Sequence, residues 1–251
     1  MDLGLADRTY ILTGATGGLG LATAQVLVAE GAKVVISSRS QESVDRTVAE
    51  LGTSATGIAA DNSDPGTPAR LISAARDSFG RLDGALISVG GPPAGLLMER
   101  SEDEWRSAFE SVFLGSIRLA TAVGAELGDG GSIAFVLSSS AKMPVANLAI
   151  SNGLRPGLAM AAKTLADELG PRGIRVNGLL PGRVDTDRVR ELDALADDPA
   201  ASRAANEAAI PLRRYGKPEE FGRAAAFLLS PASGFITGTM LPVDGGLIRG
   251  I

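Results

Sequence analysis

Short apolar runs alternate along this chain with longer stretches of helical spacing. Segments expected to form strands cover residues 8–14, 33–38, 55–61, 82–91, 131–140, 174–182 and 238–246. Segments expected to form helices cover residues 18–30, 41–51, 65–79, 102–127, 152–169, 187–208 and 218–229. Strands that are apolar throughout need cover on both faces, and strands alternating with helices build parallel sheets through right-handed crossovers. The pattern predicts an α/β fold: a single doubly wound (Rossmann) domain, with a parallel sheet of about seven strands and helices on both faces.

Nothing in the composition divides the chain. Its 251 residues are 45% hydrophobic, which is enough for a sizeable core, and no linker, repeat or low-complexity tract interrupts them. We expect one domain over residues 1–251, with a substrate lid near 187–212. The net charge of −5 and the absence of a basic stripe argue against nucleic acid as a partner. The N-terminus lacks a signal pattern and no long apolar run is present, so we expect a cytoplasmic protein that does not bind membranes.

The chain contains no cysteine and no histidine. This excludes disulfides, thiol nucleophiles, Cys/His zinc sites and Ser-His catalysis, and we expect no metal. Tyrosine is nearly absent as well, since only Tyr10 and Tyr215 occur. Few side chains therefore remain that can transfer a proton near neutral pH.

A glycine-rich loop, "TGATGGLG" (13–20), joins the first expected strand to the first expected helix. Gly14 permits a tight turn, Gly18 lets the backbone approach a pyrophosphate, and Gly20 lets the helix pack close to the strand. The N-terminus of the helix then presents N–H groups to phosphate. The loop predicts dinucleotide binding, and the alternative is a glycine turn without a ligand.

Several further segments accompany the loop. They are "DN" (61–62), "SVGG" (88–91), "ELGPRGIRVNGLLPG" (168–182), "PLRRYGKPEE" (211–220) and "ITGTMLPVDGG" (236–246). Together with the loop they make the chain resemble the short-chain dehydrogenase/reductase family over nearly its whole length. The pattern is similar to a divergent subgroup of 3-oxoacyl carrier-protein reductase-like sequences that lack the family's Tyr-xxx-Lys pair.

The resemblance implies a set of cofactor-binding residues. They are Gly14, Thr16, Gly18, Leu19, Gly20, Asp61, Asn62, Gly90, Pro181, Gly182, Val184 and Thr186, with Thr186 at a position that contacts the nicotinamide carboxamide. At the end of the second strand, Ser38 and Arg39 stand where an acidic residue would bind the ribose of NAD. Because arginine suits a 2′-phosphate, we expect NADP(H), and the alternative is a solvated arginine that opens a helix.

The resemblance also implies where catalytic groups belong, and most of them are replaced. Ser151 stands at the position of the family's tyrosine, Arg155 at that of its lysine, and Val112 at that of its asparagine. The family's serine corresponds to Ser138 or Ser139. A serine hydroxyl is a far weaker acid than tyrosine, whereas Arg155 can hold ribose or stabilise an oxyanion but is a poor proton donor.

Few other side chains are candidates for supplying the proton that the family's tyrosine would donate. Lys142 follows the serine strand and is a candidate if burial lowers its pKa, the alternative being a solvated loop lysine. Tyr10 and Tyr215 are not well placed. We expect Asp185 to face solvent or to cap a helix.

Two functions from different classes follow. The first is an NADP(H)-dependent oxidoreductase with an altered catalytic set, acting on a small-molecule carbonyl or alcohol such as a 3-oxoacyl thioester. The second is a dinucleotide-binding sensor or assembly protein without turnover. The resemblance further implies a homo-oligomer, a tetramer or dimer, built through the helices at 105–127 and 152–169 and the last strand.

Overall fold

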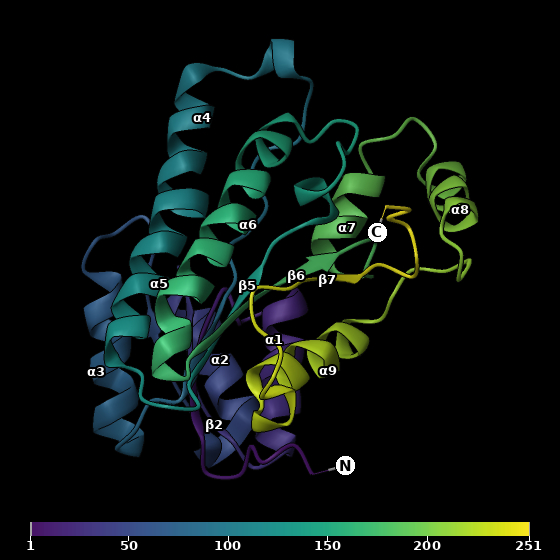
Figure 1. Cartoon of the computed structure of the whole chain (residues 1–251). Coiled ribbons are helices and arrows are strands. Elements are labelled where there is room, and N and C mark those ends of the chain that lie inside the picture. Colours follow the sequence, from purple (N-terminus) through teal and green to yellow (C-terminus); the bar gives the residue numbers. More distant parts are fainter. Residues whose placement is uncertain (1, 251) are drawn as a thin grey trace.

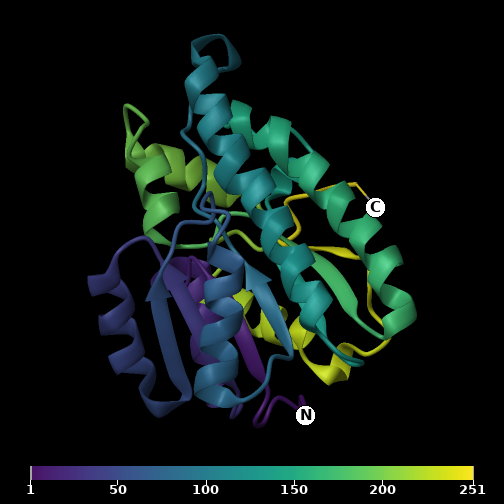
Figure 2. The same ribbon diagram turned by 90° about the vertical axis from the view of Figure 1, so that its left-hand side faces the viewer.

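The computed structural model describes residues 2–250, and in these residues one seven-stranded sheet forms the centre of the molecule. The strands lie in the order β3-β2-β1-β4-β5-β6-β7, and every neighbouring pair is parallel. Helices lie on both sides of the twisted sheet (Figure 1, Figure 2). The predicted single Rossmann-type α/β domain is therefore confirmed.

The strands are short and mostly buried, as expected for a sheet that is covered on both faces. They are β1 (Thr9–Thr13), β2 (Lys33–Ser38), β3 (Ala55–Ala59), β4 (Gly84–Ile87), β5 (Ser132–Val136), β6 (Arg175–Pro181) and β7 (Met240–Val243). The α-helices are α1 (Gly18–Ala29), α2 (Gln41–Leu51), α3 (Thr67–Phe79), α4 (Glu102–Ala108), α5 (Gly115–Glu126), α6 (Ala149–Leu169), α7 (Asp187–Asp193), α8 (Pro199–Ala209) and α9 (Pro218–Leu229).

Two hydrophobic layers hold the helices against the sheet. On one face, Leu71 of α3, Leu119 of α5 and Leu158 of α6 pack in one buried cluster. On the other face, Leu27 of α1 and Phe221 of α9 belong to a second cluster. Because β1 has β2 on one side and β4 on the other, the crossovers diverge beside β1 and leave a crevice at the carboxyl ends of the strands.

The helix predicted over 102–127 is interrupted by a π-helical segment, Phe109–Leu114, between α4 and α5. A π-helical segment bonds residue i to i+5 rather than i+4, and so short a change of period is not resolved by the apolar spacing of a long helical stretch. Directly after it, Gly115 meets the turn that follows β3: a Cβ at residue 115 would lie 2.2 Å from the main-chain oxygen of Asn62.

The single helical segment predicted over 187–208 is wrong, since two separate helices, α7 and α8, occupy it. Asp198 ends the connection by accepting a hydrogen bond from the N–H of Ala201 at 3.0 Å, and Pro199 follows at the first helical position. An N-cap with a proline behind it starts a new helix rather than continuing the old one.

The strand predicted over 131–140 also ends earlier than expected. β5 stops at Val136, and the hydroxyl of Ser138 accepts a hydrogen bond from the N–H of Ser140 at 3.1 Å. A 3₁₀ turn, Ser139–Ala141, follows. A serine that bonds the backbone two residues ahead offers the chain an alternative to the sheet ladder, which turns the chain out of the sheet here.

One helical stretch among the described residues, Glu102–Glu126, is long and apolar enough by composition to cross a membrane. In its most apolar window, 44% of the residues are buried inside the domain, and α5 packs against α3 and α6. The stretch therefore serves as a core helix of this domain.

The close contact at Gly115 makes a prediction about stability. The substitution Gly115→Ala places a methyl group against the carbonyl of Asn62, and we expect the free energy of unfolding to fall by about 1–3 kcal/mol despite alanine's higher helix propensity. Gly170→Ala is the matched control, because residue 170 is also right-handed helical and no atom lies within 4 Å of an added Cβ. Urea unfolding of both variants measures the difference, and equal stability of the two would contradict the packing argument.

Candidate functional site

The glycine loop between β1 and α1 is tied to the end of β4. Thr13 donates its hydroxyl to the Ser88 carbonyl at 2.7 Å and accepts the Ser88 N–H at 2.9 Å. Gly14 has a φ of +58°, and a Cβ there would lie 2.9 Å from the same Ser88 carbonyl. This position requires glycine for both its conformation and its closeness to β4.

The N-terminus of α1 is open. Gly17 is its N-cap, no side chain caps it, and its first turn carries no acidic residue. No atom lies within 4 Å of a Cβ built on Gly17, and the same holds for Gly90 after β4. Gly20, in contrast, packs so tightly that its Cβ would lie 2.4 Å from the Gly14 oxygen. Free N–H groups beside unfilled space suit a phosphate, so this cradle fits a dinucleotide.

Two of the other predicted loop residues, Thr16 and Leu19, lie in the same turn and are half-buried. The main-chain oxygen of Leu19 accepts a hydrogen bond from Thr23 at 2.8 Å, within α1. Both predicted residues therefore border the cradle without closing it.

The ends of β2 and β3 bring Arg39 and Asp61 together at the exposed rim of the sheet. Asp61 accepts hydrogen bonds from the N–H and hydroxyl of Ser63 at 2.9 and 2.8 Å. The Ser63 N–H, with help from the charge of Arg39, lowers the pKa of the Asp61 carboxyl. Ser38 turns its hydroxyl back to the Ser40 carbonyl at 3.2 Å, which leaves Arg39 exposed at this end. Asn62, the remaining predicted residue here, is half-buried beside them.

The turn after β6 faces the glycine loop. Gly182, which follows Pro181, donates its N–H to Val243 of β7 at 3.1 Å, and the buried Val184 pairs with Gly216 in an isolated β-bridge. Thr186 is the N-cap of α7 and accepts the Val189 N–H at 3.4 Å. The methyl group of Thr186 would lie 3.5 Å from a Cβ on Gly18, so this turn closes one side of the cradle.

Three serines lie near the end of β5. The resemblance assigns the family's functional serine to either Ser138 or Ser139. Ser138 is partly exposed and bonds the Ser140 N–H, whereas Ser139 is buried and makes no side-chain hydrogen bond among the described residues. Ser140, which the sequence analysis did not single out, forms a buried hydroxyl pair with Ser151 of α6 at 2.9 Å. Its only sequence signal is the run of three serines.

Arg155, one helical turn after Ser151, is only 4% exposed. Its guanidinium donates to the Val136 carbonyl at 2.7 Å and to the Val89 carbonyl at 3.4 Å, and its Nε has no partner. No carboxylate among residues 2–250 pairs with it within 4.0 Å. This burial lowers the pKa of Arg155 to about 10. The structure thus places a buried cation beneath the ends of β4 and β5.

The surroundings of Ser151 and Arg155 are apolar. Val112, at the position the resemblance assigns to asparagine, is 2% exposed and packs with Ile150 and Leu154. No polar side chain replaces the asparagine there. Lys142 is exposed, so the burial on which its role as a proton donor depends is missing.

Neither tyrosine provides a free acid. Tyr10 is fully buried, donates to the Leu229 carbonyl at 3.3 Å, and burial raises its pKa to about 12. Tyr215 is buried and donates to Asp193 at 3.0 Å, and burial together with that carboxylate raises its pKa.

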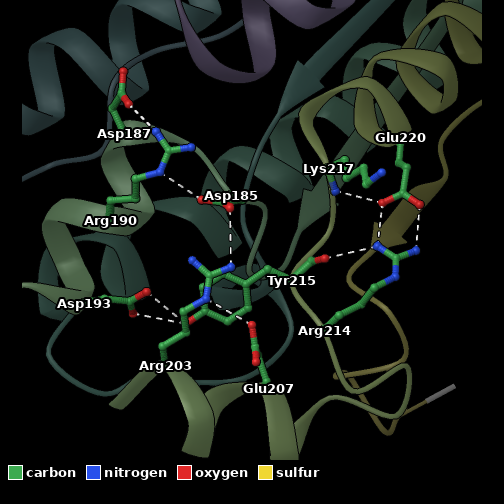
Figure 3. Close-up of polar contacts among 10 residues, drawn as sticks. All are labelled: Asp185, Asp187, Arg190, Asp193, Arg203, Glu207, Arg214, Tyr215, Lys217 and Glu220. Carbon is green, nitrogen blue, oxygen red and sulfur yellow. Dashed lines mark hydrogen bonds and ion pairs between the residues drawn. The ribbon is translucent and has the colours of Figure 1, made fainter. Parts of the chain in front are cut away.

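The expectation that Asp185 faces solvent or caps a helix holds only in part. Its side chain is 32% exposed, but Thr186 caps α7, and the Asp185 carboxylate pairs with Arg190 at 3.0 Å and Arg203 at 3.3 Å. Figure 3 shows both guanidinium groups turned toward this carboxylate. Because Arg203 lies on α8 and Arg190 on α7, Asp185 joins both helices of the predicted lid to the turn after β6. In a sequence, a carboxylate just before a helix predicts an N-cap. The pairing with Arg203, 18 residues away, could not be predicted from the sequence.

A second contact secures the same helices. The Arg203 guanidinium lies 4.5 Å from the centre of the Tyr215 ring, and Asp193 at the end of α7 accepts the Tyr215 hydroxyl (Figure 3). Asp193 also pairs with Arg183 at 3.2 Å. The pairs of Asp185 with Arg190 and Arg203, the pair of Asp193 with Arg183 and this cation–π contact join α7 and α8 to the rest of the domain. Within the described residues, no group of three or more carboxylates is arranged to hold a metal ion.

Comparison with known proteins agrees with this architecture. A family model described as Enoyl-(Acyl carrier protein) reductase matches residues 14–248. The 3-oxoacyl-[acyl-carrier-protein] reductase FabG of Vibrio cholerae is 32% identical, over 98% of this chain and 99% of its own. A short-chain dehydrogenase/reductase (glucose/ribitol dehydrogenase) structure from Brucella melitensis superposes over the whole of both chains with a TM-score of 0.92 and 30% identity. L-sorbose reductase from Gluconobacter frateurii, solved with NADPH and L-sorbose, also covers both chains fully, with a TM-score of 0.90 and 27% identity.

Proposed function

This chain belongs to the short-chain dehydrogenase/reductase family of oxidoreductases, and we propose that it uses NADP(H) to reduce a carbonyl group, with a 3-oxoacyl thioester as the first substrate to test. The observation that carries the proposal is the open N-terminus of α1, which lies beside unfilled space at Gly17 and is closed on one side by the Thr186 turn. The similarity to FabG of Vibrio cholerae supports the choice of substrate class.

The choice of NADP(H) rests on Arg39. Its guanidinium is exposed at the end of β2, next to the Asp61 turn, and no acidic residue occupies its place. An arginine there can form charge-assisted hydrogen bonds to a 2′-phosphate. The NADPH complex of the Gluconobacter frateurii reductase supports the same cofactor.

The catalytic set that we propose is built from serine hydroxyls. A nicotinamide bound here would supply or accept the hydride, and a carbonyl that gained a hydride would carry negative charge on its oxygen. Ser138 is the partly exposed member of the set and would donate its hydroxyl to that oxygen. The Ser140–Ser151 hydroxyl pair is connected to Ser138, because the N–H of Ser140 donates a hydrogen bond to the Ser138 hydroxyl oxygen. This set stands in place of the family's Tyr-xxx-Lys pair.

Arg155 adds a fixed positive charge beneath this site. Its two carbonyl contacts join the ends of β4 and β5, so it braces the loops that would flank the nicotinamide end. A buried charge acts more strongly than an exposed one, because less water screens it. We propose that Arg155 favours a developing oxyanion from below and that the proton itself comes from water.

The burial of Arg155 also favours a second candidate function. Its guanidinium is engaged with main-chain oxygens rather than free for a ribose, and no tyrosine supplies an acid. A dinucleotide-binding sensor or assembly protein needs the cradle and Arg39 but not turnover. The experiment on Ser138 below separates the two candidates.

The residues given as cofactor contacts on the resemblance remain part of the proposal. Ser38 and Asn62 are half-buried at the ends of β2 and β3, Val184 is buried in the turn after β6, and Gly14, Gly18 and Thr186 border the cradle. The lid at 187–212 would cover the substrate, and a cytoplasmic location stays a prediction.

Arg39 should determine the preference for NADPH over NADH. Arg39→Ala should raise the Kd for NADPH by about 10- to 100-fold, since hydrogen bonds to a charged group contribute about 1.5–3 kcal/mol. The Kd for NADH should not change, because NADH has no 2′-phosphate. Calorimetric titration with each dinucleotide measures both values, and tighter wild-type binding of NADH than of NADPH would refute the cofactor choice.

Ser138 should be needed for turnover. With a 3-oxoacyl thioester and NADPH, Ser138→Ala should lower kcat/KM by about 10²–10³-fold, the usual cost of losing an oxyanion donor. Ser139→Ala is the matched control and should keep wild-type activity, because its hydroxyl makes no hydrogen bond. Wild-type protein that binds NADPH without oxidising it, on this thioester and on a wider carbonyl panel, would favour the sensor.

We also propose a homo-oligomer formed through α4, α5 and α6. Phe109 (41% exposed) stacks on Phe113 with centroids 5.1 Å apart, Gly157 of α6 lies against Phe113, and Met160 of α6 is 64% exposed. Exposed apolar side chains on adjacent helices suit helix–helix association. Light scattering at micromolar concentration should give a dimer or tetramer, and a monomer would count against this.

A further inference from the structure

Arg188 crosses from the lid to the opposite wall of the crevice. It lies in the first turn of α7, two residues after Thr186, and its Nη2 donates to the Pro92 carbonyl at 2.8 Å. Its Nε would lie 3.1 Å from a Cβ on Gly91, so the guanidinium rests directly on the loop that follows β4. No other feature of the sequence singles this arginine out.

This contact spans the place where the proposed dinucleotide must pass. The same short segment meets both walls: Thr186 approaches Gly18 of the glycine loop, and Arg188 reaches Gly91 and Pro92 beyond β4. Since β1 and β4 are neighbours in the sheet, these two loops form the two sides of one channel. The proposed dinucleotide would have to occupy this channel, which Thr186 and Arg188 border.

The positive end of the α1 dipole would not by itself balance the negative charge of a bound diphosphate. The α1 N-terminus supplies N–H groups and the positive end of one helix dipole, equivalent to about half a charge, to a group that carries roughly two negative charges. Arg188 is the charged side chain on the opposite side of the channel. Its one carboxylate partner, Glu191, is 3.6 Å away on the same helix and 68% exposed, which makes a weak pair.

The Pro92 carbonyl is a neutral acceptor, and Arg188 can exchange it for a stronger one. Its side chain is 39% exposed, so the guanidinium is free to swing without unpacking a core. A guanidinium binds phosphate oxygens through charge-assisted hydrogen bonds, often two in parallel, which are stronger than bonds to a neutral carbonyl. A phosphate within reach would therefore compete well with Pro92.

We propose that Arg188 leaves Pro92 and binds the diphosphate of the dinucleotide from the lid side, opposite the N-terminus of α1. This inference rests on the proposed function, because it assumes that a dinucleotide occupies the channel. Binding then draws α7 onto the cofactor, which couples the lid to the occupied site. Arg39 reads the 2′-phosphate at one end, and Arg188 reads the diphosphate that NADPH and NADH share.

The experiment is calorimetric titration of wild type, Arg188→Ala, Arg188→Gln and Arg39→Ala with NADPH, NADH and 2′-AMP. Arg188→Ala should weaken NADPH and NADH alike, each by about tenfold, and leave 2′-AMP unchanged because it has no diphosphate. Arg188→Gln should behave like Arg188→Ala, because glutamine can still donate to the Pro92 carbonyl but has no charge. Arg39→Ala should show the reverse pattern, weakening NADPH and 2′-AMP but not NADH.

Each other outcome has a definite meaning. Wild-type affinity of Arg188→Ala for both dinucleotides overturns the inference and leaves the proposed function standing. Near-normal binding by Arg188→Gln overturns it too, since the contact with Pro92 rather than the charge would then matter. An unchanged Kd for NADPH with a raised KM for the carbonyl substrate would assign Arg188 to the substrate instead. Failure of wild-type protein to bind either dinucleotide overturns the proposed function itself, and this inference with it.

Discussion

Close main-chain packing between the glycine loop and the end of β4 is the constraint on which the site depends. Gly14 brings its backbone against Ser88, Gly20 lies against Gly14, and Thr13 exchanges two hydrogen bonds with Ser88. These contacts fix the N-terminus of α1 beside the β4 loop. A crevice with defined walls results, because neither wall can shift without breaking a contact that only glycine permits.

The nicotinamide end of the crevice combines weak acids with a strong fixed charge. Its buried hydroxyls, Ser140 and Ser151, bond one another, and Arg155 beneath them has only carbonyl partners. An unpaired buried cation is costly, and it persists where the surrounding structure compensates for that cost. Such an arrangement can stabilise negative charge above it, yet it supplies no proton of its own. The proposed reduction would therefore need water to reach the site, whereas the proposed binding of a dinucleotide would not.

Ion pairs and one long arginine side chain join α7 and α8, the predicted lid, to the rest of the domain. Asp185 and Asp193 connect α7 and α8 to the turn after β6 and to Tyr215 (Figure 3). Arg188 reaches across to Pro92. Arg188 follows Asp185 by three residues, so its contact with a neutral carbonyl lies close to the ion pairs of Asp185. On the proposal above, this neutral contact is the one for which a charged ligand would compete.

The sequence by itself determined the order of strands and helices, the parallel sheet and the glycine cradle, because periodicity and glycine spacing are local properties of the chain. The family was indicated by the resemblance of several motifs spread along the chain. The sequence did not show that α7 and α8 are separate, that Ser140 rather than a neighbour meets Ser151, or that Asp185 pairs with Arg203. Only the tertiary structure decided these points, together with the burial of Arg155 and the reach of Arg188. Each depends on partners brought together from distant parts of the chain, and the spacing of residues along one segment carries no record of them.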